Sequence, residues 1–187
     1  MKNVVTSLEI SGVVLGLFVL FSYCIYTPSA KNQHALWAGL NDPCMFKIWC
    51  VTASTSVFAF IFFFARLITA NDETMLNPWY ETTLWPLTVF LASAALYMPV
   101  ATRGFRYATI ALLAITAASA WLILACSVEV FGWNVESAFL LVLAFHCTAI
   151  DLIYWGWTWW VGIDQPFEVV LHSQPHNGDI KAVVVNM

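Results

Sequence analysis

The chain has 187 residues, of which 61% are hydrophobic and only 10% charged, and its net charge is −4. Soluble domains carry about a quarter charged residues, so this composition excludes an ordinary soluble domain and indicates a membrane protein. The slight negative charge also excludes an extended basic surface, so neither nucleic acid nor a polybasic contact with anionic lipid is expected.

Five apolar segments are each long enough to cross a hydrocarbon layer about 30 Å thick, which takes about 20 residues. The predicted fold class is therefore an all-α membrane protein, a compact bundle of five transmembrane helices over residues 1–163 with a C-terminal tail over 164–187. The five predicted spans are residues 8–26, 48–70, 84–101, 107–128 and 135–161.

The first span has two interpretations. Lys2 precedes it and Pro28, Ser29 and Ala30 follow it, which is also the pattern of a cleaved secretory signal. We favour a retained helix because the run is long and because Gly12 and Gly16 form a GxxxG pair. Such a pair lets a neighbouring backbone come close, and incidental small residues in an apolar run are an equal alternative. Cleavage would leave four spans.

Two connections constrain the later helices. Asn77 followed by Pro78 is a favourable N-cap and first-turn pair, so the third helix is expected to begin before its apolar core. The connection between the fourth and fifth spans is very short, which makes these two helices antiparallel neighbours.

Basic residues predict the orientation, because short loops rich in Lys and Arg stay on the cytoplasmic side. Five of the seven basic residues fall on one side and two on the other: Lys31, Lys47, Arg103, Arg106 and Lys181 against Lys2 and Arg66. This distribution predicts an N-terminus outside and a cytoplasmic C-terminus.

Eight of the ten tryptophans lie near predicted helix ends, as amphipathic rings do at membrane interfaces. Four of them, Trp155, Trp157, Trp159 and Trp160, close the fifth span, where we expect packing, anchoring or contact with a ligand. In its five spans, small size and many tryptophans the chain resembles, in composition alone, the translocator-protein class of ligand binders. No residue is carried over from that class.

After residue 164 the composition changes. Two β-prone stretches, residues 167–172 and 180–185, flank Pro175 and the pair Asn177-Gly178, which predicts a β-hairpin in the tail. An isolated hairpin is marginal in water, so it is expected to rest on the membrane surface, the helix ends or a partner.

Catalytic motifs are missing from the sequence. It contains no GxSxG elbow, P-loop, dinucleotide fingerprint or HExxH, so we predict no catalytic residue, no metal and no cofactor, and favour a non-enzymatic protein. His146 and Asp151 share the fifth span, but an α-helix would place them about 140° apart around its axis. We therefore expect them not to act together.

Asp151 lies inside the fifth span, where a carboxylate facing lipid would cost about 2.5–3.5 kcal/mol. It is expected to turn toward the bundle, uncharged, among hydrogen-bonding side chains. It acts there either as a neutral acid that joins two helices or as a proton- or ligand-binding group. The candidate residues around it are Thr148, Tyr154 and Trp155 of the same span, Thr52 and Ser56 of the second span, and Tyr97 of the third. Arg66 and Glu136 are a separate candidate for a structural ion pair.

Two functions fit these features. We favour a non-enzymatic subunit or assembly factor of a membrane complex, because small residues line the third and fourth spans and the tail could dock on a partner. The alternative is a binding or transport protein for an apolar ligand or a proton-coupled solute, with a polar cavity around Asp151. The expected partners are the lipid bilayer and other membrane subunits or a second copy of the chain.

Overall fold

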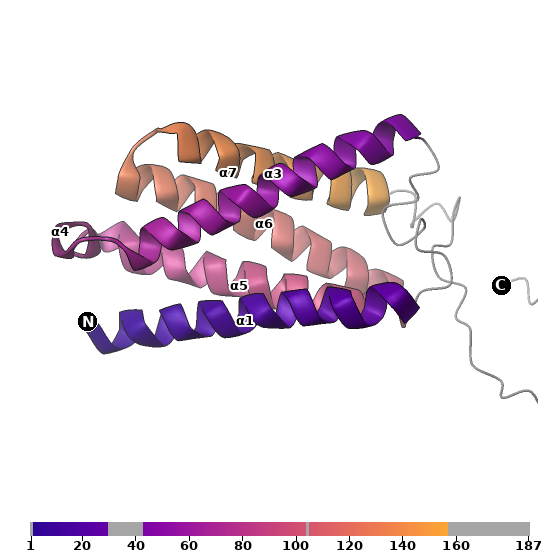
Figure 1. The fold of residues 1–187 in the computed structure, drawn as a ribbon, viewed down its shortest axis with the longest axis horizontal. Coiled ribbons are helices and arrows are strands. Elements are labelled where there is room, and N and C mark those ends of the chain that lie inside the picture. Colours follow the sequence, from indigo (N-terminus) through magenta and orange to yellow (C-terminus); the bar gives the residue numbers. More distant parts are fainter. Residues whose placement is uncertain (1, 30–42, 104, 157–187) are drawn as a thin grey trace, which may run out of the picture.

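Every described segment of the protein is helical in a computed structural model, which covers residues 2–29, 43–103 and 105–156 and the side chains of 10–26, 43–103, 105 and 107–156 (Figure 1). No strand occurs in these segments. The elements are α1 (Lys2–Ser29), α3 (Pro43–Ile68), α4 (Asp72–Met75), α5 (Pro78–Ala101), α6 (Arg106–Phe131), α7 (Val135–Phe145) and the π-helix η1 (His146–Trp155).

Four helices are long and apolar enough to cross a membrane, namely Pro43–Ile68, Pro78–Ala101, Tyr107–Phe131 and Val135–Trp155. They correspond to the second to fifth predicted spans, so the all-helical class with four candidate membrane-spanning helices is confirmed. The apolar part of α1, Ile10–Tyr26, is shorter, and a fifth crossing stays a prediction. The tail with its predicted hairpin, the last part of the fifth span and Trp157, Trp159 and Trp160 lie outside the described residues.

Local signals explain where the helices begin and end. The Asn77 side chain accepts a hydrogen bond from the Trp79 backbone N–H, so α5 begins at Pro78, six residues before its predicted apolar core. Gly132, with φ of 72°, follows the last residue of α6. Asn134 then caps α7 by accepting from the Ser137 N–H. This tight turn makes α6 and α7 antiparallel neighbours, as the short connection predicts.

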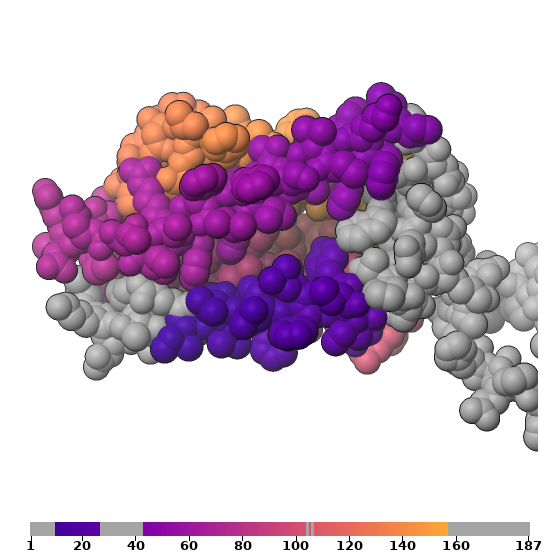
Figure 2. Space-filling view, viewed as in Figure 1, coloured from indigo at the N-terminus to yellow at the C-terminus, as the bar shows by residue number. Residues whose placement is uncertain are grey.

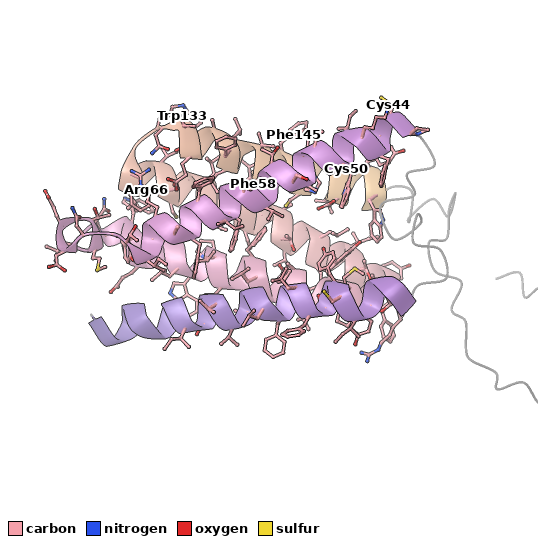
Figure 3. All side chains as sticks on the ribbon, viewed as in Figure 1. Cys44, Cys50, Phe58, Arg66, Trp133 and Phe145 are labelled. Carbon is pink, nitrogen blue, oxygen red and sulfur yellow. The ribbon has the colours of Figure 1, made fainter. Side chains whose placement is uncertain are left out.

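The bundle has one long helix lying across the others. In Figure 1, α1, α5 and α6 run alongside one another, whereas α3 crosses the front of the bundle at a slant toward α7 and η1. Figure 2 shows a groove on this face between the indigo surface of α1 and the purple surface of α3. Figure 3 places Arg66 and Trp133 at one end of the bundle and Cys44 and Cys50 at the other.

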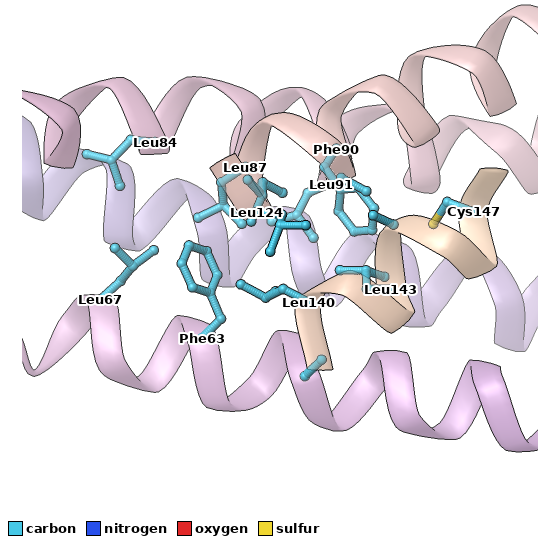
Figure 4. Close-up of a cluster of buried hydrophobic side chains, with 14 of the residues drawn as sticks. Phe63, Leu67, Leu84, Leu87, Phe90, Leu91, Leu124, Leu140, Leu143 and Cys147 are labelled. Atoms are coloured by element: carbon cyan, nitrogen blue, oxygen red, sulfur yellow. The ribbon is translucent and has the colours of Figure 1, made fainter. Parts of the chain in front are cut away.

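The core lies where α3, α5, α6 and α7 meet. Phe63 and Leu67 of α3, Leu87 of α5 and Leu140 of α7 are almost fully buried there (Figure 4). On α6 the buried positions include the small residues Ala117 and Ala120 beside Ile123 and Leu124. Small residues let α5 and α6 approach closely, and the hydroxyl oxygens of Ser93 and Thr116 lie 2.7 Å apart.

The predicted GxxxG contact on α1 is wrong in its geometry. A Cβ added to Gly12 would lie 2.7 Å from Cε2 of Phe64, so this glycine makes room for an aromatic ring of α3, not for a backbone. A Cβ added to Gly16 would meet nothing within 4 Å. The two glycines therefore have different roles, although their spacing suggests one.

Replacing Gly12 by Leu is expected to destabilise the bundle, because the Phe64 ring cannot move freely. That ring stacks on Phe60 at 6.2 Å between centroids, and Phe60 stacks on Phe90 at 5.8 Å. Overpacking of this kind costs about 1–3 kcal/mol. The matched variant Gly16→Leu should change stability by less than about 0.5 kcal/mol. Thermal unfolding of both variants in detergent measures the difference, and equal midpoints would contradict the contact.

Candidate functional site

The last part of the candidate span Val135–Trp155 is the π-helix η1. In a π-helix, backbone hydrogen bonds join residues five apart. At its end the Gly156 N–H donates to the carbonyl oxygen of Asp151. A π turn holds more residues than an α turn, so side chains five positions apart move toward the same face. Such segments inside α-helices are frequent at functional sites.

This widened turn brings His146 and Asp151 together, so the expectation that they point in different directions is wrong. His146 Nε2 lies 3.5 Å from Asp151 Oδ2. The angular separation of about 140° holds only for α geometry, which ends at Phe145. The His146 side chain is 7% exposed and that of Asp151 is 30% exposed, so the histidine forms the inner member of the pair.

Thr52 of α3 holds the other side of the imidazole ring. Its Oγ1 lies 2.8 Å from His146 Nδ1, and the same hydroxyl donates to the Ile48 carbonyl at 2.9 Å. A hydroxyl has one hydrogen to donate. When Thr52 gives that hydrogen to Ile48, Nδ1 must carry the hydrogen of the neutral ring and donate it to Oγ1. Nε2 is then an acceptor that faces the Asp151 carboxyl group.

Aromatic side chains of three further helices interact with the pair. Trp49 of α3 lies 6.0 Å from the His146 ring, centroid to centroid, and within hydrogen-bonding reach of Asp151. Tyr97 of α5 and Tyr23 of α1 lie close enough to the same carboxyl group to interact with it electrostatically. Side chains from α1, α3, α5 and η1 thus converge on Asp151.

The structure brings only part of the predicted site together. Thr52 and Tyr97 lie near Asp151, and Tyr97 also makes an edge contact with the buried Trp155 at 5.6 Å. Tyr154 packs with Trp155 in a small apolar cluster. The remaining predicted residues, Thr148 and Ser56, have different partners.

Thr148 and Ser56 form hydrogen bonds with partners other than His146 and Asp151. The Trp121 Nε1–H donates to Thr148 Oγ1 at 2.9 Å, which directs Thr148 toward α6. The Ser56 hydroxyl donates to the Thr52 carbonyl at 2.7 Å, within its own helix. The predicted polar stripe assumed α-helical spacing over the whole span, and the π turn shifts that register.

Sequence reasoning missed two members of the site, Trp49 and Tyr23, and set His146 aside. Trp49 and Tyr23 lie near the ends of predicted spans, where aromatic rings are common as membrane anchors. The available signal was their depth, since both lie at the same end of the bundle as Asp151. For His146 the sequence offers no indication that the helix widens.

Arg66 and Glu136 meet at the opposite end of the bundle. Arg66 Nη1 lies 2.8 Å from Glu136 Oε2, and the guanidinium carbon lies 4.3 Å from the centre of the Phe131 ring. The pair joins the last turn of α3 to the first turn of α7. The second oxygen of Glu136, Oε1, is buried and has no hydrogen-bond partner among the described residues, so within these segments the carboxylate depends on Arg66.

No group of three or more His, Cys, Asp or Glu side chains in the described segments could hold a metal ion. No protein-family model, curated protein or solved structure matches the chain. The resemblance to the translocator-protein class therefore stays one of composition, and the site is interpreted from its own geometry.

Replacing Thr52 by Val should destabilise the protein by about 1–3 kcal/mol, because it leaves a buried imidazole N–H without its acceptor. The matched variant is Thr55→Val, since the Thr55 hydroxyl donates only within α3, to the Val51 carbonyl at 2.8 Å. Its effect should stay within about 0.5 kcal/mol. Thermal unfolding in detergent compares the two, and a Thr55 effect as large as that of Thr52 would argue against the contact with His146.

Replacing Arg66 by Met should cost about 1–3 kcal/mol, because Glu136, only 12% exposed, loses its cation. The double variant Arg66→Met/Glu136→Gln should recover part of this loss, since the amide carries no charge. A double-mutant cycle of unfolding free energies measures the coupling. Additive effects of the two substitutions would show that the pair contributes nothing.

Proposed function

We propose that the protein is a binding or transport protein for a proton-coupled solute, with a proton-binding site formed within the membrane by Asp151 and His146. The observation that carries this proposal is the 3.5 Å approach of the two side chains across one widened turn. Geometry thus favours the function that the sequence ranks second. No catalytic role is proposed.

The hydrogen-bond pattern explains how the pair would hold a proton. With Nδ1 donating to Thr52, the imidazole presents a bare Nε2, and the only hydrogen available between the two groups is the one on the Asp151 carboxyl group. In this state the pair is neutral, as suits a low-dielectric surrounding. Release of the proton leaves one negative charge inside the membrane, where an unpaired charge is expensive.

Coupling to a solute follows from this cost. A site that loses its proton gains stability from a cation, or from a rearrangement that admits water to the carboxylate. Proton release and the binding of a second species are then linked, because each changes the free energy of the other. Asp151, the more exposed member of the pair, is the group that would meet the second species.

We further propose that the chain is a multi-pass protein that crosses the membrane five times, with its N-terminus outside and its C-terminus cytoplasmic. The length of α1, 28 residues, and its packing along α5 support the first crossing. The distribution of basic residues supports the orientation. In this topology Asp151 lies in the cytoplasmic half of the membrane, and the tail with its proposed hairpin lies on the cytoplasmic side.

A subunit or assembly role is the second candidate, and the exposure of α3 favours it. Only 17% of the most apolar window of α3 is buried, against 33–50% in the other three candidate spans. Its outward face carries large apolar side chains, including Val51, Phe58 and Phe62. Another membrane subunit or a second copy could cover this face, as lipid could. Native extraction followed by mass measurement distinguishes them, since a stable larger assembly supports the subunit role and a lone protomer contradicts it.

The proton-binding proposal predicts a carboxylic acid carbonyl band in the infrared spectrum of the purified protein at neutral pH. Asp151→Asn should abolish the band, because the amide cannot carry the acidic proton. His146→Gln should shift its frequency, because the hydrogen-bond acceptor changes. Asp72→Asn, a matched substitution at an exposed position of α4, should leave it unchanged. A band that persists in Asp151→Asn, or no band in the wild type, would overturn the proposal.

A further inference from the structure

A cleft lies between α5 and α6, at the end of the bundle that carries Arg66 and away from Asp151. Its volume is about 330 Å³. Five of its lining residues belong to the first turns of α5 and two to the last turns of α6: Pro78, Glu81, Thr82, Trp85 and Pro86, with Leu122 and Cys126. The cleft is distinct from the proton-binding pair and does not depend on it.

Polar and apolar groups are ordered along the depth of this cleft. Glu81 and Cys126 lie nearer the ends of their helices, while Trp85 and Leu122 lie four residues, or about 6 Å, farther into the span. Trp79 and Trp133 are exposed at the same end of the bundle, as is typical of the head-group level. A carboxylate at the mouth with an apolar surface below it is the order expected for an amphiphile.

The charge at the mouth is negative. Glu81 is exposed and makes no ion pair in the described part of the chain. Glu129 lies near enough to Cys126 to interact with it electrostatically, which adds a second carboxylate close to the cleft. The Trp85 side chain is 71% exposed, so its ring is available to a ligand. Glu81 and Trp85 both line the cleft, and a carboxylate together with an indole ring is a combination that attracts a methylated ammonium group.

Apart from Glu81, the walls of the cleft offer a ligand few free hydrogen-bonding groups. The Thr82 hydroxyl donates its hydrogen to the Pro78 carbonyl at 3.2 Å. Pro78 and Pro86, which both line the cleft, have no backbone N–H. A primary ammonium group has three hydrogens that need acceptors, whereas a trimethylammonium group has none and fits an apolar wall.

We propose that this cleft binds a phospholipid with a trimethylammonium head group, the ammonium lying between Glu81 and Trp85 and an acyl chain following Leu122. The ligand is supplied by the bilayer as phosphatidylcholine. The carboxylate and the indole determine head-group preference, and Leu122 contributes contact that any acyl chain would share.

Lipid retention tests the proposal with the full-length purified protein. Phosphatidylcholine, phosphatidylethanolamine and phosphatidylglycerol with identical acyl chains are added separately, and bound lipid is counted by native mass spectrometry. Phosphatidylcholine should bind more tightly than the other two. Glu81→Gln and Trp85→Leu should each weaken its binding about three-fold, as expected for exposed ion-pair and cation–π contacts, and leave phosphatidylglycerol binding unchanged or slightly improved.

The control is Glu73→Gln, which removes the same charge from an exposed position of α4 outside the cleft. It should not change phosphatidylcholine binding, and a loss as large as that of Glu81→Gln would overturn the proposal. Equal binding of all three lipids by the wild type would overturn it as well, and equal binding of phosphatidylethanolamine would overturn the preference for a methylated group. Elution volume and helical circular dichroism show that each variant is folded.

Discussion

Hydrocarbon offers no hydrogen-bond partners, so each polar group inside a spanning helix must find one within the protein. In this chain that constraint acts most strongly on His146 and Asp151. The widened turn of η1 places His146 Nε2 beside the Asp151 carboxyl group, and Thr52 of α3 contacts the other imidazole nitrogen, Nδ1. Apolar packing cannot fix how α3 crosses η1 by itself, because leucine gains little on leaving lipid for a helix interface. The polar contact gives that crossing a defined position.

The two ends of the bundle use polar side chains differently. At one end, Arg66 and Glu136 form a 2.8 Å ion pair backed by the Phe131 ring, which ties two helix termini together and needs no mobile proton. At the other end, Asp151 faces a neutral imidazole and several aromatic rings. Asp151 and His146 can share a proton and release it, whereas the Arg66–Glu136 ion pair holds no such proton. We therefore propose a functional role for the first pair and a structural role for the second.

Much of the fold could be predicted from the sequence, because membrane helices are determined by long apolar runs and by caps that act locally. The four candidate spans and the start of α5 at Asn77-Pro78 follow from these signals. The pairing of Arg66 with Glu136 was also accessible, since opposite charges at one depth of the bundle need each other. These inferences use only length, hydropathy and side-chain type.

The rest depends on contacts that no local pattern records. The alignment of His146 with Asp151 requires a departure from α geometry, and the sequence reads as α-helical throughout that span. Likewise, the GxxxG spacing does not predict that Gly12 faces the phenyl ring of Phe64 while Gly16 faces open space. From the sequence alone, Trp49 and Tyr23 resemble interface anchors. In the structure, both interact with the Asp151 carboxyl group. Such positions are where tertiary structure overrides the average behaviour of a residue type.

The tilt of α3 is expected to depend on the thickness of the surrounding membrane. With 26 residues, the helix is about 39 Å long, more than the hydrocarbon layer of about 30 Å. A long helix adapts to a thinner bilayer by leaning farther and to a thicker one by standing more upright. Because Thr52 belongs to α3 and His146 to η1, a change in the tilt of α3 would alter the contact between them. The thickness of the bilayer would then act on the proposed proton-binding pair through the tilt of one helix.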